Sequence, residues 1–139
     1  QWEGAPVFQG LRELMEKALI AYDWGESFVA NNLVAKIAAD ETLRELSTVA
    51  RSFRDPLLAS LAENQLRDSD RSRRWSAELV KFCTDAKPQN KEIIQGWIEQ
   101  WTPLATNAIS AYCSALPAGE NAAKSAISRM EAFHRSLEV

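Results

Sequence analysis

The sequence predicts an all-α fold, and two observations carry this prediction. Apolar residues recur at three- and four-residue spacing along most of the chain, which is typical of helices with one buried face. No alternating run of Val, Ile and Thr is long enough for a sheet, and the 5 glycines and 5 prolines all stand singly. With 139 residues, 46% of them hydrophobic, the chain can bury its own core, so we expect residues 1–139 to form a single domain.

The first predicted helix is long. Its apolar stripe begins at residue 7 or 11 and continues to residue 37, and a shorter helix follows over residues 41–53. Gly25 falls inside the first helix, where glycine costs about 1 kcal/mol relative to alanine. We therefore expect the backbone of another segment to approach Gly25 closely.

Three further helices are predicted over residues 57–84, 91–116 and 120–137. Asp55 and Pro56 are residue types that helices favour as N-cap and first residue, so they mark the start of the first of these. Asn90 is expected to cap the next helix. Pro103 lies inside that helix and predicts a kink or a restart, because proline lacks the backbone donor and clashes with the preceding turn.

Two carboxylates interrupt the apolar run of the first predicted helix. Asp23 and Glu26 are three residues apart and would share one helix face, with Tyr22 one turn before Glu26. A carboxylate that leaves water without a partner costs several kcal/mol or more. We therefore expect these side chains to be paired, bound to a metal, or set in a polar seam between helices or subunits.

Composition excludes several classes of protein. A net charge of -3 leaves no electrostatic footprint for nucleic acid, and no run of eighteen apolar residues is present to cross a membrane. The two cysteines, Cys83 and Cys113, form no Cys-x-x-Cys motif, so we expect buried, inert thiols in a reducing cytoplasm. One local basic cluster is interpreted as a solvated helix face or an ion-pair network; it comprises Arg67, Arg71, Arg73 and Arg74, with Asp68, Asp70 and Glu78 as the acids.

Two segments have the outline of a metal-binding motif. Residues 68–72 have the outline of Asp-Glu-x-Arg-His, whose Glu and His would be helix-borne ligands of a carboxylate-bridged metal pair, but Ser69 and Ser72 stand at those positions. Glu131 and His134 form a literal Glu-x-x-His with the chain's single histidine. No second such motif exists, and we interpret this one as part of an ordinary apolar stripe.

Several clustered aromatic and glycine motifs occur along nearly the full chain. They are YDWGESFVA (22–30), NLV (32–34), DRSRRW (70–75), QGW (95–97), WTPL (101–104) and AYCSALP (111–117). Together they resemble the beta subunit of the hydroxylase of bacterial multicomponent di-iron monooxygenases, in particular the toluene and alkene monooxygenase branch.

The resemblance implies a partial ferritin-like helical bundle, with long antiparallel helices and shorter trailing ones, and no metal of its own. Glu26, Ser69 and Ser72 would occupy degenerate ligand positions, so no catalytic or cofactor-binding residue is expected in this chain. The di-iron centre would belong to a catalytic alpha subunit. A gamma subunit, an effector protein and a reductase would complete an oxygen-dependent monooxygenase complex.

Subunits of that family are more than twice this length, and the chain opens on Gln1 rather than Met. We therefore expect it to be the carboxyl-terminal portion of a longer subunit with a structural role. The alternative is a stand-alone helical interaction module that shares only the bundle architecture.

Five tryptophans are more than a core of this size requires. Trp and Arg are enriched at the centres of protein interfaces, so part of this set is expected near subunit contacts. The candidates are Trp24, Arg71, Arg74, Trp75 and Trp101.

Overall fold

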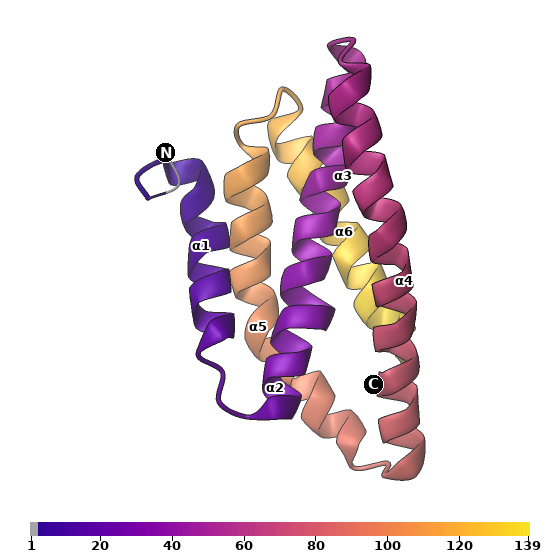
Figure 1. The fold of residues 1–139 in the computed structure, drawn as a ribbon. Coiled ribbons are helices and arrows are strands. Elements are labelled where there is room, and N and C mark those ends of the chain that lie inside the picture. Colours follow the sequence, from indigo (N-terminus) through magenta and orange to yellow (C-terminus); the bar gives the residue numbers. More distant parts are fainter. Residues whose placement is uncertain (1–2) are drawn as a thin grey trace.

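The computed structural model describes residues 3–139, and all regular structure within them is helical, which confirms the predicted all-α class. The helices are α1 (Pro6–Leu19), α2 (Trp24–Phe28), the π-helix η1 (Val29–Ala35), α3 (Lys36–Ser52), α4 (Pro56–Ala86), α5 (Asn90–Cys113) and α6 (Gly119–Ser136). The long helices alternate in direction (Figure 1). α3 stands in the middle of the bundle and contacts α4, α5 and α6, while α1 and α4 lie at opposite edges.

The core lies where α3 and η1 meet α1, α5 and α6. Its largest fully buried apolar side chains come from five different elements: Leu14, Leu33, Ile37, Ile109 and Met130. None of the helices in residues 3–139 combines the length and the hydropathy that crossing a bilayer requires.

The prediction of one helix up to residue 37 is wrong. α1 ends at Leu19, and a new helix begins after Asp23, whose Oδ1 accepts a hydrogen bond from the backbone N–H of Glu26 at 3.0 Å. Asp23 is therefore an exposed N-cap and not a buried helical carboxylate. The break predicted between residues 37 and 41 is also wrong, because α2, η1 and α3 form one continuous helical segment from Trp24 to Ser52.

The middle of this segment is π-helical. The backbone N–H of Lys36 bonds to the carbonyl of Asn31, five residues earlier, as in a π-turn. Side chains saturate neighbouring carbonyls: Asn31 donates to Ser27 at 2.9 Å and Asn32 donates to Phe28 at 3.2 Å. Side-chain amides thus bond to the carbonyls that directly precede the π-helical turns.

The start of α4 follows the prediction. Asp55 accepts from the backbone N–H of Leu58 at 3.0 Å, and Pro56 is the first helical residue. Asn90 does not cap α5 as predicted. It is instead the first residue of α5, and its Nδ2 donates to the carbonyl of Cys83 at 3.0 Å, which closes the end of α4. α5 does not restart at Pro103 but continues through it, and its first turns run obliquely in Figure 1.

Two glycines sit at tight contacts, and only one is the predicted site. A Cβ on Gly25 would lie 2.9 Å from the indole of Trp97, so a side chain approaches there and not the expected backbone. Backbone approach occurs at Gly10, where a Cβ would lie 2.8 Å from the Cα of Ala108. This contact brings α1 and α5 close together.

Candidate functional site

Glu26 is held by α5. Its Oε1 accepts hydrogen bonds from Nε2 of Gln100 at 2.9 Å and from the indole Nε1 of Trp101 at 3.1 Å. Neither Tyr22, whose side chain is fully exposed, nor any arginine among the described residues bonds to this carboxylate. A shallow hollow surrounds the carboxylate, lined by Lys17, Ile20, Ala21, Tyr22, Gln100, Trp101 and Leu104. Glu26 thus joins α2 to α5 through neutral donors.

Ser69 lies in a different part of the bundle. It is buried on α4, where its Oγ donates to Oδ1 of Asp40 at 2.8 Å and accepts from Nζ of Lys36 at 2.5 Å. Ser72 is half-buried one turn further on. Because Asp40 lies several turns beyond Glu26, the structure does not bring Glu26 together with Ser69. The three degenerate positions therefore do not converge on one site.

A cluster of buried charges, which we call the charge cluster, links α3 with α4 and α6. At its centre is Glu41, whose Oε1 accepts from Arg73 at 2.6 Å and whose Oε2 accepts from Arg129 at 2.6 Å. Arg73 also reaches Asp40 at 3.2 Å. The remaining members are Lys36, Arg44, Glu45 and Ser69.

Sequence reasoning missed this cluster because Asp40 falls between the two predicted helices and Glu41 begins the second, and carboxylates at such positions are commonly solvated. The continuous helix buries both side chains. Burial by itself raises the pKa of Glu41, but hydrogen bonds from Arg129 and Arg73 outweigh it and leave the pKa below its ordinary value. Glu41 is therefore ionised and paired at neutral pH.

The carboxylates of the bundle interior do not fit a di-iron centre. Such a centre needs about four carboxylates and two imidazoles converging from four helices. Here Asp40 and Glu41 are taken up by guanidinium groups, and within residues 3–139 no three His, Cys, Asp or Glu side chains are placed to hold a metal. A metal at these acids would have to displace two arginines.

The Glu-x-x-His motif is not a pair of ligands either. Nε2 of His134 lies 2.8 Å from the carbonyl oxygen of Leu33 in η1 and donates to it, while Glu131 pairs with Arg135 at 3.8 Å. Burial lowers the pKa of His134 below its ordinary value. A neutral imidazole thus ties α6 to the π-helix.

The thiols offer little nucleophilic chemistry. Cys113 is buried as predicted, and burial raises its pKa, whereas Cys83 is only half-buried. A raised pKa keeps the thiol protonated and unreactive at neutral pH.

The predicted contact residues divide into exposed and buried ones. Trp24 is 72% exposed and stacks on Phe28, with ring centroids 5.8 Å apart. Phe28 in turn forms a T-shaped contact with Trp75, which is 58% exposed, with ring centroids 5.9 Å apart. Trp101 is only 5% exposed, so it belongs to the core and offers almost no surface to a partner.

The basic cluster of α4 divides in the same way. Arg73 turns inward to the charge cluster, and Arg67 bonds to Asn64. Arg71 and Arg74 are exposed and form no ion pair with the described residues. Of the two interpretations of this cluster, the solvated face therefore holds for them, and the ion-pair network with Asp68, Asp70 and Glu78 does not. These two guanidinium groups form a solvated face.

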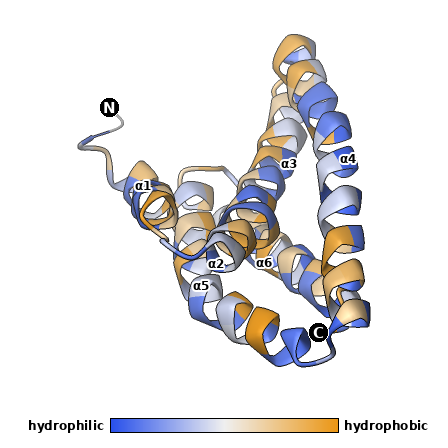
Figure 2. Cartoon of the chain, turned by 60° about the horizontal axis from the view of Figure 1, so that its bottom comes forward, coloured by the Kyte–Doolittle hydropathy of each residue, from blue (hydrophilic) through white to orange (hydrophobic). Residues whose placement is uncertain are grey.

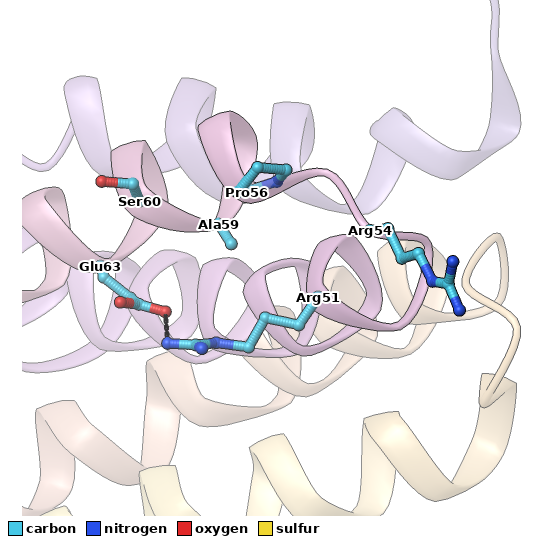
Figure 3. A pocket seen from close by; sticks show the side chains of 6 residues that line it. All are labelled: Arg51, Arg54, Pro56, Ala59, Ser60 and Glu63. Atoms are coloured by element: carbon cyan, nitrogen blue, oxygen red, sulfur yellow. Dashed lines mark hydrogen bonds and ion pairs between the residues drawn. The ribbon is translucent and has the colours of Figure 1, made fainter.

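A second hollow lies at the turn between α3 and α4 (Figure 3). Arg51 and Glu63 form an ion pair across it, and Arg54 points away from the others. Ala59, Pro56 and Ser60 complete the lining. One ion pair and one hydroxyl supply no set of acid, base and nucleophile, so this hollow has no catalytic constellation.

Fold and site together define a helical bundle whose interior acids are bound by its own arginines. Residues 1–87 match the family model described as "Methane/Phenol/Alkene Hydroxylase", and the chain belongs to this family. It is 48% identical over 116 residues to the beta subunit of the hydroxylase component of the toluene-4-monooxygenase system of Ectopseudomonas mendocina, over 83% of this chain and 35% of the relative. It is 30% identical over 115 residues to an oxygenase component of phenol 2-monooxygenase from Pseudomonas sp. (strain CF600), over 78% of this chain and 33% of the relative.

A solved structure gives the same assignment. The structure described as "Toluene bound in the resting active site of toluene 4-monooxygenase (T4moH)" matches with a TM-score of 0.78 and 48% identity, over 81% of this chain and 38% of that chain. This match confirms the predicted ferritin-like helical fold. The chain spans about a third of the length of the curated relatives that it matches.

Proposed function

We propose that this chain is the carboxyl-terminal portion of the beta subunit of a monooxygenase hydroxylase, with a structural and non-catalytic role. One observation carries the proposal. The interior acids Asp40 and Glu41 are bound by Arg73 and Arg129 in a chain that is 48% identical to a hydroxylase beta subunit. The scaffold is kept while its buried carboxylates serve packing and not chemistry.

The reaction belongs, in this proposal, to a catalytic alpha subunit that carries the di-iron centre. That subunit would insert one oxygen atom from O2 into a hydrocarbon or aromatic substrate. The relatives are named for toluene, phenol and propane, and the 48% identity favours the toluene type over the other two. A gamma subunit would be part of the same hydroxylase, and an effector and a reductase would act on the whole complex in the cytoplasm.

Contacts with other subunits are proposed where apolar side chains reach the surface. One exposed group lies at the junction of α1 and α2 and includes Leu19, Ile20, Tyr22 and Trp24. Large exposed apolar groups of this kind mark protein interfaces. Arg71, Arg74 and Trp75 lie on a second exposed face, that of α4.

Co-expression tests the proposal. The chain, with an affinity tag, is produced together with the alpha and gamma subunits of a toluene-type hydroxylase, and the purified material is analysed for composition, iron and substrate oxidation. We expect a stable complex in which iron follows the alpha subunit. Iron bound stoichiometrically to this chain alone would contradict the proposal, and so would an alpha subunit that never co-purifies, which would favour a stand-alone interaction module.

Two matched variants locate the contact. Trp24→Ala removes an exposed aromatic ring at the α1–α2 junction and is expected to lower recovery of the complex, because Trp is a common anchor of interfaces. Phe53→Ala removes an equally exposed ring at the end of α3 and serves as the control. Equal recovery for both variants would place the contact elsewhere.

A further inference from the structure

The hollow around Glu26 combines a carboxylate with apolar walls. It lies at the end of the molecule where α1 and α2 each contact α5, and Figure 2 shows the connection from α1 to α2 passing beside α5 there. Ile20 and Leu104 are among its apolar lining residues, and its volume is about 420 Å³. The hollow is therefore large enough to admit a side chain of another protein.

The carboxylate of Glu26 is only partly used by the fold. Both of its hydrogen bonds, from Gln100 and Trp101, go to the same oxygen, Oε1. Within residues 3–139 no donor reaches Oε2, although each oxygen of a carboxylate can accept two hydrogen bonds. Both donors are neutral, so the charge of Glu26 has no counter-ion in this part of the chain.

The nearest candidate for a counter-ion is engaged elsewhere. Lys17 is the one cationic residue among those that line the hollow. Its Nζ bonds to Glu13, one turn earlier on α1, at 2.7 Å. The hollow therefore presents a negative charge that its own lysine does not neutralise.

The rim of the hollow is apolar and aromatic. Ile20 is 80% exposed and the Tyr22 side chain is fully exposed, so water covers both in the isolated chain. A protein that buries these side chains also takes Glu26 out of water, which is costly unless Oε2 gains a positive partner. Arginine fits this position better than lysine, because its guanidinium group is more weakly hydrated and can stack on an aromatic ring such as that of Tyr22.

We propose that the hollow around Glu26 receives an arginine side chain of the catalytic alpha subunit, whose guanidinium group donates to Oε2 of Glu26. This inference rests on the proposed function and adds the chemistry of one contact. The partner segment carries a single arginine among apolar residues, which cover Ile20 and Tyr22. Glu26 then has two tasks, because Oε1 joins α2 to α5 and Oε2 binds the other subunit.

Glu26→Gln tests the contact in the complex of this chain with the alpha and gamma subunits of a toluene-type hydroxylase. The variant keeps an oxygen for Gln100 and Trp101 but removes the charge that the arginine needs. Truncating one partner of a buried charge pair acts mainly on dissociation. The alpha subunit should therefore dissociate at least about tenfold faster from this variant than from the native chain.

Glu99→Gln is the matched control. Glu99 precedes Gln100 on α5 but does not line the hollow, and the new amide oxygen can still accept from Gln95 as the carboxylate does at 2.8 Å. The same charge is lost close by, so dissociation should change by less than about twofold. Circular dichroism of the isolated chain should show native helicity for both variants, because each keeps its internal acceptor.

A double-mutant cycle identifies the arginine. Each arginine of the alpha subunit is replaced in turn by glutamine, and dissociation is measured with the native chain and with Glu26→Gln. One replacement should speed dissociation from the native chain as much as Glu26→Gln does. Combined with Glu26→Gln it should have little further effect, because the two changes remove the same contact.

The outcomes separate this inference from the proposed function. An intact complex that dissociates equally fast with Glu26→Gln and Glu99→Gln would overturn the arginine contact and leave the structural role in place. The same holds if no arginine replacement speeds dissociation from the native chain, or if every replacement adds fully to Glu26→Gln. A native chain that forms no complex with the alpha subunit would overturn both.

Discussion

Arg129 on α6 donates its Nε–H to Oε2 of Glu41 on α3 across 2.6 Å, and the carboxylate is only 1% exposed. The other oxygen of Glu41 accepts from Arg73 on α4. The guanidinium of Arg73 also lies over the ring of Phe133 on α6, 5.9 Å from its centroid. Glu41 therefore joins α4 to α6 through two guanidinium groups.

Replacing this carboxylate should destabilise the fold strongly. Glu41→Gln keeps the size of the side chain but leaves Arg73 and Arg129 without their shared counter-charge. Removing one partner of a buried ion pair typically costs about 3–5 kcal/mol. We expect a loss of about 3 kcal/mol in the free energy of unfolding, measured by urea denaturation.

Glu131→Gln is the matched control. It removes the same charge from an exposed pair with Arg135, which should change the free energy of unfolding by no more than about 0.5 kcal/mol. Similar losses in the two variants would show that the charge cluster contributes no more than a surface pair.

The same carboxylate should make the stability of the fold depend on pH in the acidic range. The pKa of Glu41 is lowered in the folded state, so the unfolded chain binds more protons once the pH drops below the ordinary value of 4.5. Its contribution to stability is present above pH 4.5 and is lost as the pH falls through the folded-state pKa. Melting temperatures from pH 7 to 3 should fall less steeply for Glu41→Gln, and parallel curves would contradict this assignment.

His134 should act in a higher pH range. Its pKa is lowered from an ordinary value of 6.5, so the neutral ring stabilises the fold above that pH and this contribution is lost as the pH falls through the folded-state pKa. His134→Ala also leaves the Leu33 carbonyl without its side-chain donor, at a cost of about 1–3 kcal/mol.

His134→Gln provides the comparison, because its amide can still donate to the carbonyl but does not titrate. We expect it to lose less stability than His134→Ala and to flatten the dependence of the melting temperature between pH 7 and 5. An unchanged slope in both variants would exclude His134 as the titrating group.

Glycine substitutions should separate close packing from helix propensity. Gly10→Ala drives a methyl group into the backbone of Ala108 and should cost about 1–3 kcal/mol. Gly96 lies on α5, the helix that Gly10 approaches, and a Cβ there would meet no atom within 4 Å. Gly96→Ala should therefore stabilise the protein by about 0.5–1 kcal/mol. Thermal unfolding of both variants measures the difference, and effects of the same sign would contradict the close approach of α1 and α5.

Local signals allowed the later helices to be predicted from sequence. Asp55 and Pro56 define the start of α4 because their preferences depend only on neighbouring backbone groups. The break after Leu19 was missed, since the apolar stripe continues through it and Asp23 was read as a helical residue. One N-cap bond, from the backbone of Glu26, decides between the two readings.

The candidate site was less predictable. Single carboxylates such as Asp40 and Glu41 give no sequence signal of burial when their partners, Arg73 and Arg129, lie far along the chain. Glu26 was expected to be paired, and it is, but its partners on α5, the exposed Gln100 and the buried Trp101, could not be named from spacing. Long-range pairing is a property of the packing, which periodicity does not encode.

The π-helical turns change the direction in which side chains point along this segment. Turns closed five residues apart use more residues than α-turns, so the angular phase of side chains before Val29 lags behind that of side chains after Ala35. A helical wheel drawn across both sides superimposes residues that face different neighbours. This phase shift lets one unbroken rod present Glu26 to α5 and, further along, Asp40 to α4.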